Sequence, residues 1–126
     1  MQTGLNIFVD DERDPPPGDW LVARTASGCE QILKTRASAI ISFDHDLGCD
    51  DTGATLPSGH DCVRLLIEAA MDRPDVVADL RIIVLHSANP VGRANMRGLI
   101  EGAVRHDILP AVRLIDMPVT SHPLAT

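Results

Sequence analysis

Acidic side chains gather in two short stretches of this 126-residue sequence. Of the 18 Asp and Glu residues, five lie between positions 10 and 19 and four lie between positions 44 and 51. Carboxylates that converge repel one another, and a hard divalent cation relieves that repulsion. We therefore expect Asp10, Asp11 and Asp44 to bind one divalent metal ion, Mg²⁺ or Mn²⁺. The alternative is that these residues are solvated loop acids or helix caps.

Two histidines accompany the acidic stretches. His45 lies between Asp44 and Asp46, and His86 directly follows an apolar run. Imidazole titrates near neutral pH, so each ring can donate or accept a proton in a reaction. We expect His45 and His86 to act as base and acid, with Asp46 either orienting a histidine or binding the metal. The alternative is a hydrogen-bonded structural histidine at each position.

The residues after position 86 suit an anion. Asn89 is a favourable N-cap and Pro90 a favourable first helical residue, and the N–H groups of a helix N-terminus carry partial positive charge. Arg93 and Arg13 can each add a charge-assisted hydrogen bond to a phosphate. We expect Ser87, Asn89, Arg93 and Arg13 to bind the phosphate group. Helix capping alone would also explain Ser87 and Asn89, and Arg13 can instead pair with a neighbouring acid.

Apolar runs alternate with helical patterns along the chain, which predicts a parallel sheet with helices on its faces. Capping boxes at Ser27–Glu30 and Ser58–Asp61 indicate two helix starts, and the prolines at 14–19 exclude a helix there. Ligands of such sheets bind beyond the carboxyl ends of the strands, where all three polar clusters fall. Strands are predicted at 5–9, 20–24, 39–43, 81–85 and 111–115, and helices at 27–36, 58–71 and from 90 onward.

Length and composition restrict the function classes. The chain has the size of one domain, predicted at 1–115 with an irregular tail at 116–126. A formal net charge of −7 and only three aromatic residues argue against binding to duplex DNA and against base stacking. No apolar run is long enough for a membrane span, and no signal peptide is apparent. Three cysteines without a CxxC motif indicate reduced thiols and a cytoplasmic location.

The order of these motifs resembles the receiver domain of response regulators across residues 5–115. An acidic pair follows the first strand, Asp44 ends the third, and a Ser-Ala pair follows the next long strand. Two departures stand out: prolines replace the first crossover helix, and the lysine of the fifth strand is missing. The motifs at 10–15, 44–48 and 86–96 are more similar to a divergent branch, the cyclic-phosphate processing receiver-like family.

This resemblance implies a three-layer, flavodoxin-type α/β fold whose first crossover helix is replaced by a Pro-rich loop. It also implies a phosphoesterase that uses a metal to hydrolyse or process a cyclic phosphate, in a nucleotide or at an RNA end. Two other readings stay open. One is a signalling receiver that accepts a phosphoryl group on Asp44, and the other is a non-catalytic sensor that binds a cyclic nucleotide.

Overall fold

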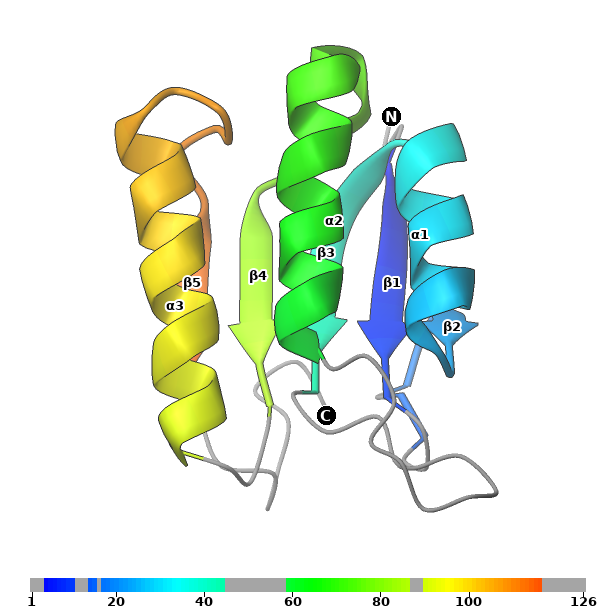
Figure 1. Ribbon diagram of the computed structural model, residues 1–126. Helices are drawn as coiled ribbons and strands as arrows, with labels where there is room; N and C mark the ends of the chain where they lie inside the picture. The colour runs from blue at the N-terminus through cyan, green and yellow to red at the C-terminus, as the bar shows by residue number, and fades with distance from the viewer. Residues whose placement is uncertain (1–3, 11–13, 16, 45–58, 87–89, 117–126) are drawn as a thin grey trace.

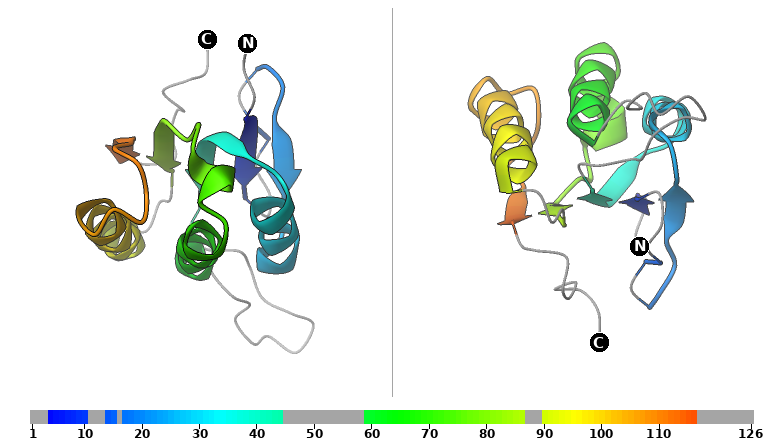
Figure 2. Two further views of the ribbon diagram at one scale, coloured as in Figure 1. Left: turned by 90° about the horizontal axis from the view of Figure 1, so that it is seen from above. Right: turned by 60° about the horizontal axis from the view of Figure 1, so that its bottom comes forward.

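A five-stranded parallel sheet forms the centre of the molecule, in the strand order β2-β1-β3-β4-β5. The computed structural model describes residues 4–10, 14–15, 17–44, 59–86 and 90–116. The strands are β1 (Leu5–Val9), β2 (Leu21–Ala23), β3 (Ser38–Phe43), β4 (Ile82–Leu85) and β5 (Arg113–Asp116). The helices are α1 (Ala26–Thr35), α2 (Gly59–Asp72), the short 3-10 helix η1 (Pro74–Val77) and α3 (Pro90–Arg105). The predicted parallel sheet and flavodoxin-type, receiver-like fold are confirmed. The described residues form two layers rather than the predicted three, because their α-helices all cover the same face of the sheet (Figure 1, Figure 2).

The three α-helices of the described residues lie on one face of the sheet (Figure 1, Figure 2). Parallel strands are joined by right-handed crossovers, so the direction of each step along the sheet decides which face its helix covers. The steps from β2 to β3, β3 to β4 and β4 to β5 all run in the same direction. Only the step from β1 to β2 runs the other way, and its described residues, 10, 14–15 and 17–20, contain no helix.

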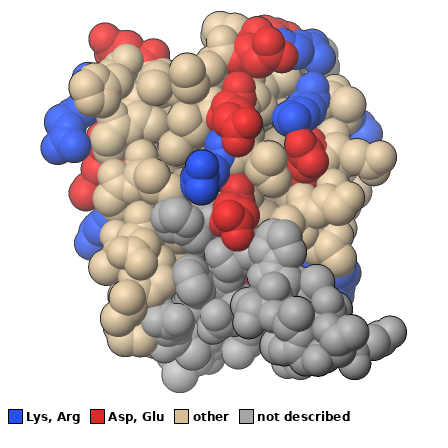
Figure 3. Space-filling view, viewed as in Figure 1, with Lys and Arg blue, Asp and Glu red and all other residues tan. Residues whose placement is uncertain are grey.

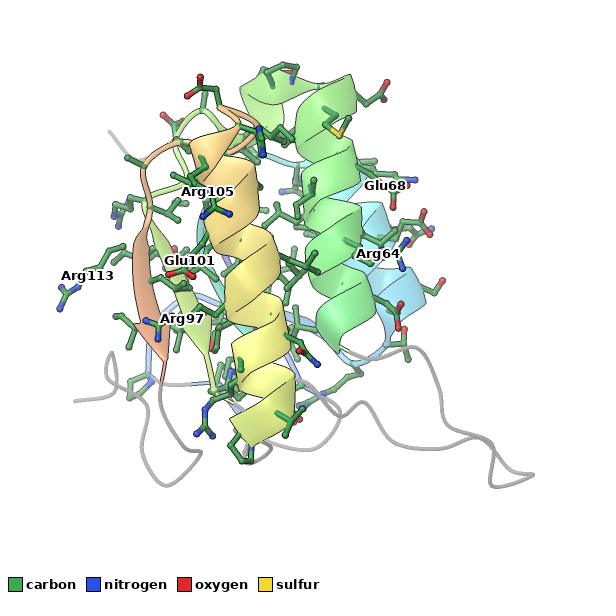
Figure 4. The ribbon with its side chains drawn as sticks, turned by 60° about the vertical axis from the view of Figure 1, so that its left-hand side comes forward. Arg64, Glu68, Arg97, Glu101, Arg105 and Arg113 are labelled. Atoms are coloured by element: carbon green, nitrogen blue, oxygen red, sulfur yellow. The ribbon has the colours of Figure 1, made fainter. Side chains whose placement is uncertain are left out.

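The helices are amphipathic, which fixes them against the sheet. Their apolar sides pack on the alternate strand residues that point the same way, among them Val9, Phe43 and Leu85. Their outer sides carry intermixed acidic and basic groups (Figure 3). Arg97 and Glu101 lie one turn apart along α3 with Nε and Oε2 3.7 Å apart (Figure 4), an exposed pair that adds little stability.

A second row of side chains is buried on the face opposite the helices. Phe8 of β1, Ser42 of β3 and Val84 of β4 are register partners across three strands. All three are buried, and none belongs to the core between sheet and helices. The middle residue of this row is a serine, so this face of the sheet buries a polar side chain as well as apolar ones.

The start of α1 differs from the sequence prediction. The predicted capping box at Ser27 and Glu30 is wrong, since α1 begins at Ala26 with Thr25 as its N-cap. The Thr25 hydroxyl accepts a hydrogen bond from the Gly28 amide at 3.0 Å, which satisfies a donor that the helix itself cannot. Glu30 pairs instead with Lys34, four residues on. The second predicted cap, Ser58, lies outside the described residues.

We expect Thr25→Ala to lower the free energy of unfolding by about 1 kcal/mol, because the Gly28 amide loses its acceptor. Thr25→Ser should keep most of the stability. Ser27→Ala is the control and should be close to neutral, since Ser27 is exposed at the second helical position. Urea denaturation of the three variants measures the differences, and a larger loss for Ser27→Ala than for Thr25→Ala would contradict the assignment.

Two buried thiols meet where α1 packs on α2. Cys29 and Cys62 are both free and inaccessible. A hydrogen bond with Cys62 and burial together raise the pKa of Cys29 far above its ordinary value. The folded state therefore keeps this proton while the unfolded chain releases it above about pH 8.5. Stability that is fully present at neutral pH should accordingly be lost as the pH rises.

We expect the free energy of unfolding to fall above about pH 8.5, with Cys29 contributing up to about 1.4 kcal/mol per pH unit. Urea denaturation under reducing conditions between pH 7 and pH 10 measures this slope. Cys29→Ala should make this slope shallower by up to about 1.4 kcal/mol per pH unit, which corresponds to the release of one proton on unfolding. Equal slopes for the two proteins would show that Cys29 does not hold its proton in the folded state.

Candidate functional site

The carboxyl ends of three neighbouring strands bring Asp10, Asp44 and His86 into one row. Each residue directly follows its strand, and the interstrand hydrogen bonding continues into all three. The Asp44 amide donates to the Val9 carbonyl and the His86 amide donates to the Phe43 carbonyl, both at 2.9 Å. The sheet, rather than a loop, therefore fixes the backbone of all three residues.

Both carboxylates of this row are buried. Asp10 is 0% exposed and Asp44 is 4% exposed. Burying a carboxylate is unfavourable unless hydrogen bonds or opposite charge compensate it. For Asp10, one such partner is His86, whose Nε2 lies 2.9 Å from Oδ2 of the carboxylate.

The His86 ring is held at both nitrogens. Its Nδ1 lies 2.6 Å from the Ser42 hydroxyl oxygen, opposite the Nε2 contact with Asp10. An ionised carboxylate can only accept, so Nε2 carries a proton and donates to Asp10. In the neutral ring, Nδ1 then accepts a hydrogen bond from the Ser42 hydroxyl. To exchange a proton with a substrate, the ring would have to leave one of these two partners.

Aromatic rings support the histidine from the side. The Phe8 ring stacks on the His86 ring with centroids 4.8 Å apart and an angle of 5° between the planes. Trp20 in turn meets Phe8 edge to face at a centroid distance of 6.1 Å. These contacts restrict the tilt of the imidazole, so hydrogen bonds and stacking together define its position.

Ser42 is a site residue that the sequence analysis missed. His86 follows β4 and Asp10 follows β1, so their side chains meet across the intervening strand β3. A short side chain at position 42 leaves room for the ring to cross. The available sequence signal was a serine within the apolar run 39–43, two positions before Asp44 and so on the same face of the strand.

Arg24 is a second residue without a role in the sequence analysis. Its Nη1 donates to the backbone carbonyl of Asp10 at 3.2 Å. Its Nη2 lies 3.7 Å from Oδ1 of Asp14. Arg24 therefore ties the end of β1 to the segment that follows and places a guanidinium group beside the backbone of Asp10.

The remaining predicted site residues divide into two groups. Arg93 is half-buried in the first turn of α3, which starts at the same edge of the sheet (Figure 1). The others lie outside the described residues, so their placement stays a prediction. They are Asp11 and Arg13 after β1, His45 and Asp46 after β3, and Ser87 and Asn89 before α3.

The described donors suit a hard cation, but they supply only part of a site. Asp10 and Asp44 offer carboxylate oxygens from adjacent strand ends, the ligand type that Mg²⁺ and Mn²⁺ prefer. Within residues 4–10, 14–15, 17–44, 59–86 and 90–116, no group of three or more His, Cys, Asp or Glu side chains could hold a metal ion. A third ligand would have to come from elsewhere in the chain, as predicted for Asp11.

Comparisons with known proteins bear on this arrangement. A family model described as the cyclic-phosphate processing receiver domain matches residues 5–102, from β1 through most of α3. The chain also resembles the crystal structure of a response regulator receiver domain protein (CheY-like) from Methanospirillum hungatei JF-1. The TM-score is 0.56 at 13% identity, over 97% of this chain and 86% of that chain, and this likeness concerns the fold alone. No curated protein matches the chain.

The helices give no sign of a membrane segment. Among the described residues, none of the helices combines the length and the apolar character that a bilayer crossing needs.

We expect Asp44→Asn to raise the free energy of unfolding by about 1 kcal/mol in the presence of a chelator, because it removes one of two neighbouring buried negative charges. Asp75→Asn makes the same chemical change at an exposed carboxylate and should stay within about 0.5 kcal/mol of the wild type. Urea denaturation measures both. Destabilisation by Asp44→Asn would show that Asp44 is a structural acid rather than half of a strained, cation-binding pair.

Proposed function

The chain belongs to the cyclic-phosphate processing receiver domain family, and on that premise we propose that it is a metal-dependent phosphoesterase acting on a cyclic phosphodiester. The observation that supports this most is the pair of buried carboxylates, Asp10 and Asp44, at adjacent strand ends. A buried acidic pair of this kind suits a cation and a phosphate, which together restore charge balance. The substrate class is a cyclic nucleotide or an RNA end that carries a cyclic phosphate.

Asp10, Asp44 and Asp11 are the proposed metal ligands. Bound Mg²⁺ or Mn²⁺ would polarise the phosphoryl oxygens and lower the charge repulsion to an incoming nucleophile. The Nε2–H group of His86 lies against Oδ2 of Asp10 and restrains the orientation of the carboxylate. A hydrogen bond that orients a metal-binding carboxylate in this way strengthens metal binding.

In the proposed reaction, the oxygen of a water molecule forms a bond to phosphorus while one ring P–O ester bond breaks. The water loses a proton, the departing alkoxide gains one, and the product is a ring-opened phosphomonoester. His45 and His86 are the proposed base and acid, with Asp46 as an orienting group. Because both nitrogens of His86 are hydrogen-bonded, we propose mainly a holding role for His86 and the larger share of proton transfer for His45.

The phosphate is proposed to lie between the acidic row and the N-terminus of α3. Arg93 is in the first turn of that helix, and its guanidinium can neutralise non-bridging oxygens. Ser87, Asn89 and Arg13 are the other proposed phosphate-binding residues. A small phosphate-containing ligand, rather than a nucleic acid duplex, fits the formal net charge of −7.

A signalling receiver is the second candidate, because Asp44 lies at the end of β3 in a receiver fold. Receivers use a lysine at the fifth strand to hold the phosphoryl group. This sequence has one lysine, Lys34, and it lies in α1 with its Nζ 2.6 Å from Glu30. The absence of the fifth-strand lysine favours hydrolysis over stable phosphorylation.

We expect the purified protein to open at least one cyclic phosphodiester in the presence of Mg²⁺ or Mn²⁺. Suitable probes are 2′,3′-cyclic and 3′,5′-cyclic nucleotides and an oligoribonucleotide with a cyclic 2′,3′ end, with products separated by chromatography. Asp44→Asn and His45→Ala should each reduce turnover at least about a hundredfold. Asp75→Asn and His106→Ala change exposed residues of the same types and should leave turnover close to the wild type.

The same assay separates the alternatives. Binding of a cyclic nucleotide in calorimetry without any product would favour the sensor. A stoichiometric adduct on Asp44 after incubation with acetyl phosphate, seen by intact mass, would favour the signalling receiver. Either result would contradict the phosphoesterase assignment.

A further inference from the structure

We propose that Ser42 is a positioning residue, whose hydroxyl fixes the His86 ring so that its Nε2–H group holds Asp10 ready for a cation. This inference rests on the proposed metal site in one respect, that Asp10 is a ligand. The Ser42–His86–Asp10 arrangement itself stands on the contacts between the three side chains. They form an unbroken hydrogen-bonded chain of 2.6 Å and 2.9 Å.

Burial makes the three side chains depend on one another for their hydrogen bonds. Ser42 and Asp10 are 0% exposed and His86 is 3% exposed, so water is a poor substitute for any of the three. An ionised Asp10 requires a donor at Nε2, and in the neutral tautomer of the ring Nδ1 then accepts. The Ser42 hydroxyl supplies the matching proton and so completes the chain.

The sheet explains why position 42 controls the ring. Ser42 pairs in register with Phe8 on one side and Val84 on the other. His86 comes two residues after Val84 and stacks on Phe8, so its ring must pass over β3. A serine is short enough to allow this passage and long enough to reach Nδ1.

Ser42 does not act as a nucleophile in this arrangement, because its hydroxyl is fully buried. A comparison within the same strand clarifies its role. Ser38 is equally buried, but its hydroxyl donates to the backbone carbonyl of Val76 at 3.5 Å. Backbone contacts can therefore satisfy a buried serine of β3, whereas Ser42 is bonded to a side chain of the candidate site. Ser38→Ala is accordingly a matched control for Ser42→Ala.

The first test uses NMR of the metal-free protein. The wild type should show an Nε2–H resonance of His86 that is protected from solvent exchange. Ser42→Ala should broaden or abolish this resonance because the ring loses its anchor, and Ser42→Thr, which retains a hydroxyl, should restore it. Ser38→Ala should leave it unchanged. A sharp, protected resonance in Ser42→Ala would overturn the proposal whatever the protein does with metals.

The second test is a double-mutant cycle on Mg²⁺ and Mn²⁺ affinity, measured by calorimetry. Ser42→Ala and His86→Phe should each weaken binding roughly 10- to 100-fold. The double variant should bind as His86→Phe does, because the proposed effect of Ser42 on the metal passes through His86. Losses that multiply would show independent structural effects and overturn the inference.

The two tests also keep this inference separate from the proposed function. Metal binding by the wild type that Ser42→Ala leaves intact would contradict the positioning role alone. A wild type that binds neither metal would contradict the metal site. It would also contradict the metal-binding role proposed for the hydrogen-bonded residues Ser42, His86 and Asp10. The NMR result would still decide whether Ser42 fixes His86, and it requires only the Ser42 and Ser38 variants to fold.

Discussion

The candidate site depends on backbone hydrogen bonds that continue beyond the ends of the strands. Asp10, Asp44 and His86 are the first residues after β1, β3 and β4, and the ladder still holds their amides. Two buried acids could not be kept side by side on mobile loops, because repulsion would separate them. A sheet that is anchored by apolar packing on its other face can resist this repulsion, and the hydrogen bond from His86 then gives Asp10 a defined orientation.

The one-sided arrangement of the helices follows from the same topology. Three of the four steps along the sheet run in one direction, and right-handed crossovers place their helices together. The remaining step, from β1 to β2, coincides with the proline-rich segment. Phe8, Ser42 and His86 contact one another on the face opposite these helices.

The sequence predicted the parts of the site that obey simple rules. Asp10, Asp44 and His86 follow apolar runs, and parallel strands bring such positions to one edge. Ser42 was missed because a single serine within an apolar run does not change the prediction of a strand. Its partner, His86, is 44 residues away in the sequence. The α1 cap was misplaced because Ser27 and Glu30 have the spacing of a capping box, while Thr25 makes the actual bond to Gly28. Local patterns contain no information that separates such competing caps.

The stacked rings have a practical consequence. Trp20, the single tryptophan of the sequence, contacts Phe8, and Phe8 contacts His86. The molecule thus carries an intrinsic fluorophore one ring away from its candidate site. A displacement of the imidazole changes the surroundings of Phe8 and, through it, those of the indole. Events at the buried acids can therefore be followed optically in the unlabelled protein, at concentrations far below those that resonance or heat measurements need.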